Sequence, residues 1–258
     1  MGEVLAPAEP ATKAAAGEAP LAAVDAAAAR NRERALAEPE SAAALFAAAD
    51  SLFLAAELRS ELDLEAALAG RPPADVDALL ALEETPREPW RAAILALCAE
   101  GEELARRALE LDPELPGAHH YRALHLASLA RARGIAQSLL AGLGPKIDAA
   151  TRAAVAADPA FDDGSPHVLR GRFLDVAPWP FGDREEALEH LERAAELGPT
   201  IPCALFLGDA LWRAGRPAEA PAAWRLAFDV APVEGALLLA PFQLARARLR
   251  LELAARER

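Results

Sequence analysis

Three histidines lie close together in the segment HHYRALH: His119, His120 and His125. Two histidines on one helix can bind a single metal ion when they are spaced i and i+4, because that spacing puts both rings on one face. Neither His119 with His125 nor His120 with His125 has this spacing. We therefore expect these histidines to lie on the helix surface or to pack between repeats, and we predict no metal site here.

The other residues that could do chemistry are isolated in the sequence. His167 follows a proline suited to the start of a helix, His190 lies within a helical segment, and no nucleophile or phosphate-binding motif accompanies them. Cys98 and Cys203 are far apart and form no C-x-x-C pair, so each is expected to be a small buried apolar residue, with a disulfide as the alternative. The sequence predicts no catalytic residue, no metal and no cofactor, and therefore no enzyme.

Composition and charge limit the class of protein. The 258 residues carry a formal net charge of −13, and they are 53% apolar and only 5% aromatic. Much of the apolar fraction is alanine, the strongest helix former, so an all-α chain of thin, closely stacked layers is favoured. The negative charge repels nucleic acid and anionic membranes. The longest apolar stretch, residues 41–56, contains Asp50 and is shorter than the ~20 residues of a membrane span, so none is expected.

Residues 201–232 resemble the two-helix unit of a tetratricopeptide repeat. The unit needs a large and a small residue where its two helices approach each other, a row of residues on the second helix that faces the first helix, and a proline that ends the second helix. The match is carried by Leu207, Gly208, Leu211, Ala220, Trp224, Ala227 and Pro232. Such a repeat is an architecture, and its function depends on the surfaces that it presents.

The chain divides into three expected parts. Residues 1–22 are predicted to be a disordered tail, residues 23–88 an N-terminal helical cap, and residues 89–256 tetratricopeptide-like helical repeats. Helices are expected in the cap at 24–37, 39–58, 62–68 and 74–82. In the repeats they are expected at 90–111, 117–140 and 146–157, then from the N-caps Ser165 and Asp183, and finally at 235–256 with its arginines facing solvent. We predict an all-α, tetratricopeptide-like helical-repeat solenoid with N-terminal capping helices and a long C-terminal helix.

The run DPAFDDGSPHVLRGRFLDVAPWPFGDREEALEHLERAAELGP, residues 158–199, is similar to the central signature of the TRAP-transporter T-component family, and also to the regulator-of-microtubule-dynamics group. The resemblance extends over about residues 89–232. The residues that carry it are Asp158, Pro159, Gly164, Pro166, Leu169, Gly171, Arg172, Pro178, Pro180, Gly182, Asp183, Ala187 and Leu188.

The T-component resemblance implies a lipid-anchored helical-repeat protein that pairs with the solute-binding component of a TRAP-type transporter and can assemble with copies of itself. The sequence departs from this pattern near its start, where residues 1–20 show neither a secretory signal nor a lipidation cysteine. The compartment therefore stays open: periplasmic if a signal was removed, and cytoplasmic otherwise.

The concave face of such a repeat stack is lined by the first helix of each pair. Aligning the units on Ala123, Gly171 and Gly208 predicts a partner-binding groove of mixed apolar, aromatic and charged character. Its predicted residues are His120, Leu124, Val168, Arg172, Asp175, Leu205, Asp209, Trp212 and Arg213.

Three features of this surface have a structural alternative. Arg172 and Asp175 are spaced i, i+3, so a local ion pair competes with a binding role. Trp212 suits either a partner contact or packing beneath the C-terminal helix. Trp179 and Phe181, in the WPFGD loop, suit either a second contact surface or an intramolecular plug.

From these observations we expect a non-enzymatic scaffold that binds a protein partner, with the solute-binding component of a TRAP-type transporter as the candidate. A homo-oligomer is a further expectation. The alternative function is a carrier that holds a small apolar ligand in a helical cavity or channel.

Overall fold

The computed structural model of the chain describes residues 10–232 and 237–257, and these residues form twelve α-helices and no β-strand. The prediction of an all-α helical-repeat solenoid is confirmed. The helices are α1 (Pro10–Ala37), α2 (Ala42–Gly70), α3 (Val76–Glu84), α4 (Arg91–Leu111), α5 (Pro116–Arg133), α6 (Ile135–Leu140), α7 (Leu143–Ala157), α8 (Phe161–Val176), α9 (Arg184–Leu197), α10 (Ile201–Arg213), α11 (Ala220–Leu226) and α12 (Ala240–Arg256).

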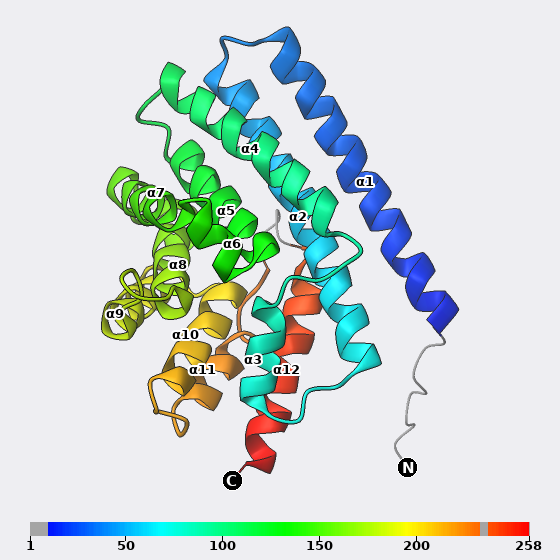
Figure 1. Cartoon of the computed structure of the whole chain (residues 1–258), viewed down its shortest axis with the longest axis vertical. Helices are drawn as coiled ribbons and strands as arrows, with labels where there is room; N and C mark the ends of the chain where they lie inside the picture. The colour runs from blue at the N-terminus through cyan, green and yellow to red at the C-terminus, as the bar shows by residue number, and fades with distance from the viewer. Residues whose placement is uncertain (1–9, 233–236, 258) are drawn as a thin grey trace.

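The long helices pack in succession, α1 on α2, α2 on α4, and then through α5, α7, α8, α9, α10 and α11. α12 contacts α10 and α11 at the end of this stack, and it also contacts α3. Figure 1 shows α3 and α12 side by side between α2 and the α10–α11 pair. The chain therefore places two segments that are far apart in sequence next to each other on the inner side of the stack. Within the described residues, no helix combines the length and apolarity needed to cross a membrane.

Several helix boundaries differ from those expected. α1 begins at Pro10, within the segment expected to be a disordered tail, while residues 1–9 of that segment lie outside the described residues. α2 continues through 62–68, which the sequence suggested was a separate helix. The expected helix at 117–140 is broken at Gly134, whose φ of +84° lies in the left-handed region, so α6 follows α5 as a short separate helix. α12 begins at Ala240, and residues 235 and 236 lie outside the described residues. The three-part domain division stays a prediction.

Two glycines set the separation of neighbouring helices. A Cβ on Gly171 of α8 would lie 2.6 Å from Leu191 Cγ and 2.9 Å from the Ala187 carbonyl oxygen of α9. A Cβ on Gly208 of α10 would lie 2.2 Å from Nε1 of Trp224 in α11. Both lie where the sequence predicted close helix packing, so the small residues fix the spacing of these two helix pairs.

Replacing Gly171 with alanine is expected to destabilise the protein. Alanine is the better helix former by about 1 kcal/mol, but the clash with α9 includes backbone and should cost about 1–3 kcal/mol beyond that gain. Urea unfolding followed by circular dichroism measures the change. Gly70→Ala is the control, because no atom lies within 4 Å of a Cβ at that position. Equal stability of the Gly171→Ala variant and wild type would contradict close packing at this point.

Candidate protein-binding site

The inner side of the stack between α8, α10 and α12 is occupied by α3. Val76, Leu79 and Leu80 of α3 are buried in the same apolar cluster as Val168 of α8 and Leu205 of α10. We call this surface the inner groove, and we define it by Val168, Arg172, Asp175, Leu205, Asp209, Trp212, Arg213, Arg246 and Arg250.

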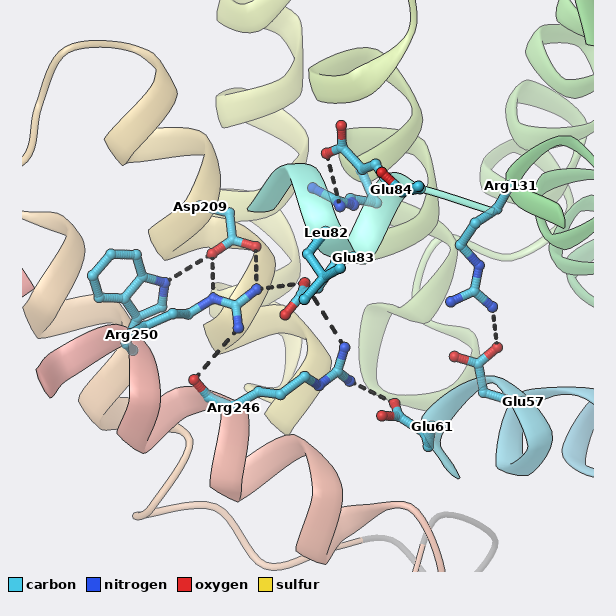
Figure 2. Close-up of polar contacts among 12 residues, drawn as sticks. Glu57, Glu61, Leu82, Glu83, Glu84, Arg131, Asp209, Arg246 and Arg250 are labelled. Atoms are coloured by element: carbon cyan, nitrogen blue, oxygen red, sulfur yellow. Dashed lines mark hydrogen bonds and ion pairs between the residues drawn. The ribbon is translucent and has the colours of Figure 1, made fainter. Parts of the chain in front are cut away.

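A buried ion cluster joins α3 to α10 and α12. Nη2 of Arg250, a residue with an exposed fraction of 0%, donates to Glu83 Oε2 at 2.7 Å and to Asp209 Oδ2 at 2.9 Å, and its Nε donates to Asp209 Oδ1 at 2.7 Å. Trp224 Nε1 donates to the same Asp209 oxygen at 3.0 Å. Figure 2 shows Arg250 between Asp209 and Glu83. A single guanidinium thus connects three helices through charge-assisted hydrogen bonds.

Arg246 extends the cluster from α12 to α2. Its Nη2 donates to Glu61 Oε1 at 2.6 Å, and its Nη1 lies 3.8 Å from Glu83 Oε2 (Figure 2). Burial raises the pKa of Glu61 to about 7, against the attraction of Arg246. Burial acts in the same direction on Glu83, but Arg250 and Arg246 outweigh it and lower the pKa of Glu83 to about 2. Glu83 therefore stays ionised at neutral pH, whereas Glu61 titrates close to neutrality.

A second group of charges holds the end of α3. Arg172 Nη2 donates to Glu84 Oε1 at 3.3 Å, and Arg172 Nη1 donates to Asp175 Oδ2 at 3.3 Å. Arg213 donates to the same two carboxylates. Burial, and then the neighbouring Arg213, lower the pKa of Arg172. The predicted ion pair between Arg172 and Asp175 is confirmed, and it belongs to a larger group that includes α3.

Trp212 lies beside α3 at the edge of the inner groove. Its Nε1 donates to Asp77 Oδ1 at 3.0 Å, and its ring centroid lies 5.9 Å from that of Trp224. Trp212 therefore contacts a segment of the chain that the sequence placed in the N-terminal cap.

His120 and Leu124 are separate from the seven other predicted groove residues. His120 is buried, and its ring lies 5.6 Å from the rings of Tyr121 and Phe161. Leu124 packs against an apolar cluster formed by residues of α2, α4, α5, α7, α8 and α9, whereas Val168 and Leu205 belong to the separate cluster around α3. The alignment of repeat units placed all nine residues on one surface, but His120 and Leu124 contact other side chains than those that surround α3.

The two aromatic residues of the WPFGD loop have different surroundings. The ring centroids of Phe181 and Phe173 lie 6.2 Å apart. Phe181 also packs against Gly144, because a Cβ added to that glycine would lie only 2.5 Å from Cε2 of the phenylalanine ring. The Trp179 side chain is 89% exposed. Phe181 therefore packs within the molecule, as expected for an intramolecular plug, whereas Trp179 is exposed to solvent.

The histidines differ in their surroundings: His119 is partly exposed and donates from Nε2 to the Pro113 carbonyl, whereas the other four lie between helices. His125 has an exposed fraction of 0%, donates from Nε2 to the Ala49 carbonyl at 3.0 Å, and lies against Gly101. His167 Nδ1 and His190 Nδ1 lie 2.7 Å apart across α8 and α9, an arrangement in which one neutral ring donates to the other. Burial lowers the pKa of both. The sequence offered no signal for this pair because the residues lie 23 positions apart.

The cysteines are unsuited to nucleophilic chemistry. Both are free and buried, and burial raises the pKa of Cys98 to about 12 and that of Cys203 to about 11. No group of three or more His, Cys, Asp or Glu residues among those described could hold a metal ion.

Neither the buried arginines of α12 nor the role of α3 was expected from the sequence. Arg246 and Arg250 were expected to face solvent, which is wrong: both are held by buried carboxylates. The available signal was spacing: Arg246 and Arg250 are four residues apart, and the buried Ala247 and Leu253 each lie three residues from Arg250, which puts the guanidinium groups on the same side of the helix as buried apolar residues.

No protein-family model and no curated protein matches the chain. Its fold is similar to that of a thermophilic TPR protein from Thermus thermophilus, with 20% sequence identity and a TM-score of 0.48, over 78% of this chain and 91% of the other. A likeness at this level does not indicate what the chain binds.

Replacing Arg250 with glutamine should strongly destabilise the protein, because Asp209 and Glu83 would be left as buried carboxylates without their main partner. Loss of one member of a buried ion pair costs about 3–5 kcal/mol. Arg248→Gln is the control, since Arg248 lies on the same helix but is exposed, and it should change the free energy of unfolding by less than about 0.5 kcal/mol. Urea unfolding compares the two, and similar values would contradict the role of the ion cluster.

The buried neutral histidines should make stability depend on pH. Burial lowers the pKa of His120 and of His125 from 6.5 to about 4, so the unfolded chain binds these protons first as the pH falls. Their contribution is complete above pH 6.5 and is lost as the pH falls toward 4, by up to about 3 kcal/mol for each histidine. His120→Gln should therefore flatten the plot of unfolding free energy against pH between these values. An unchanged slope would contradict a buried neutral imidazole.

Proposed function

We propose that the chain is a non-enzymatic scaffold that binds another protein, with the inner groove and the WPFGD loop as its contact surfaces. The observation that carries the proposal is the position of α3, because the inner groove holds a short helix through apolar side chains and arginines. Because the inner groove binds a helix of its own chain, it has the side chains needed to bind a similar helix of a partner protein. The exposed Trp179 supports the second surface, since large aromatic side chains are frequent anchors at protein interfaces.

The partner that the T-component resemblance implies is the solute-binding component of a TRAP-type transporter. This finer proposal rests on the signature at residues 158–199. Assembly with copies of the same chain stays a prediction of the same resemblance.

A small-molecule carrier has less support. A surface pocket of about 420 Å³ lies on α5 and α7 and is lined by His119, Arg122, Pro145, Lys146 and three alanines. Its positive side chains suit an anionic ligand better than the apolar ligand that the sequence suggested. A cavity beside the ion cluster has a volume of about 20 Å³, room for one water molecule.

Chemical cross-linking in the native cell, followed by mass spectrometry, tests the scaffold proposal. We expect a protein partner with cross-links to the WPFGD loop or to the helices of the inner groove. Trp179→Ala should weaken the purified complex at least tenfold without changing the free energy of unfolding, because the side chain is almost fully exposed. Phe228→Ala is the control, since Phe228 is an exposed aromatic residue near the end of α11. If no protein is cross-linked, the proposal is wrong, and if Trp179→Ala weakens the complex no more than Phe228→Ala does, the WPFGD loop is not a contact surface.

A further inference from the structure

α3 resembles a short helical peptide bound in a groove more than it resembles one of the long helices of the repeat stack. It has nine residues, and the segments on either side of it contain prolines at 72, 73, 86 and 89. An isolated helix of this length is marginal in water, so its stability depends on the surface that holds it. Val76, Leu79, Leu80 and Glu83 are buried against that surface, while Ala81 on the opposite side is exposed.

The spacing of the α3 contacts defines a recognition pattern. Aliphatic residues at i, i+3 and i+4, namely Val76, Leu79 and Leu80, enter the apolar cluster. Adjacent carboxylates at i+7 and i+8, Glu83 and Glu84, meet the arginines of the groove. Helices that dock into grooves are recognised by anchors at such positions.

The charge of the inner groove matches this pattern. The groove presents four arginines to α3, Arg172, Arg213, Arg246 and Arg250, within a chain of net charge −13. Asp175, Asp209 and Glu61 neutralise only part of this positive charge. Without α3, the arginines would keep fewer carboxylate partners, so an incoming segment must bring its own acidic residues.

We propose that α3 is an internal substitute for the partner, and that the partner binds through an acidic amphipathic helix with aliphatic residues at i, i+3 and i+4 and carboxylates at i+7 and i+8. This inference rests on the proposed scaffold function and specifies its partner. The partner helix displaces α3 from the inner groove. The tethered α3 competes at an effective concentration in the millimolar range, so it sets a threshold for binding.

A synthetic peptide of residues 74–86 tests the proposal as a free copy of α3. We expect it to bind the Leu79→Ala variant, whose own α3 is weakened, at least tenfold more tightly than it binds wild type. The same peptide with Glu83→Gln and Glu84→Gln should lose at least tenfold in affinity, whereas a peptide with Ala81→Ser should bind as the parent does. Equal, weak binding to both proteins, with the variant shown to be folded by circular dichroism, would overturn the proposal.

Hydrogen exchange of wild type gives a second measurement that does not depend on a variant folding. Displacement requires α3 to detach while the helices that form the groove stay folded. Amides 76–84 should therefore exchange at least tenfold faster than amides in the middle of α10. Equal protection of the two helices would overturn the proposal. A dimer that forms with rising protein concentration and dissociates when the peptide is added would also overturn the proposal, because the groove would then bind α3 of a second copy of the chain.

Competition separates this inference from the scaffold function. If a purified protein partner binds and an excess of the free peptide does not displace it from the Leu79→Ala variant, the partner uses another surface and only this inference fails. If the peptide binds as expected but no protein partner is found, the scaffold function fails while the groove keeps its helix specificity.

Discussion

The arrangement of the inner groove depends on the buried guanidinium of Arg250. It connects α12 to Glu83 of α3 and to Asp209 of α10, residues that lie 167 and 41 positions away in the sequence. Buried charges are stable only when they are paired, so removing any one of the three leaves another uncompensated. The positions of α3, α10 and α12 are therefore coupled through one side chain, and a helix that replaced α3 would have to supply the carboxylate that Glu83 now provides.

Local sequence features predicted the layers of the fold well. Gly171 and Gly208 lie at close helix contacts, and Asp183 caps α9 by accepting hydrogen bonds from the backbone amides of Glu185 and Glu186. These features depend on neighbours a few residues apart, which a repeat pattern specifies. Helix boundaries failed where a single residue decided the outcome, as at Gly134, which ends α5 seven positions before the expected end.

The candidate site was predicted only in part, because its contacts are long-range. Seven of the nine expected groove residues lie together on α8 and α10, as the repeat alignment indicated. The alignment gave no reason to place α3 on them, since Glu84 and Arg213 lie 129 positions apart and no periodicity relates them. For the same reason the sequence did not indicate that Arg246 and Arg250 are held inside the protein. Arginines on a helix suggest a face exposed to solvent, and their carboxylate partners on α2, α3 and α10 are far away in the sequence.

The contact between α12 and α3 also restricts how this chain can change in length. In an open repeat array each unit contacts only its neighbours, so evolution can duplicate or delete a unit at the end without disturbing the others. Here an extra hairpin inserted before α12 would carry Arg250 away from Glu83, and the loss of α12 would leave Glu83 and Asp209 without their shared cation. The ion cluster of α12 thus links the end of the stack to α3, a contact that an array whose units touch only their neighbours lacks.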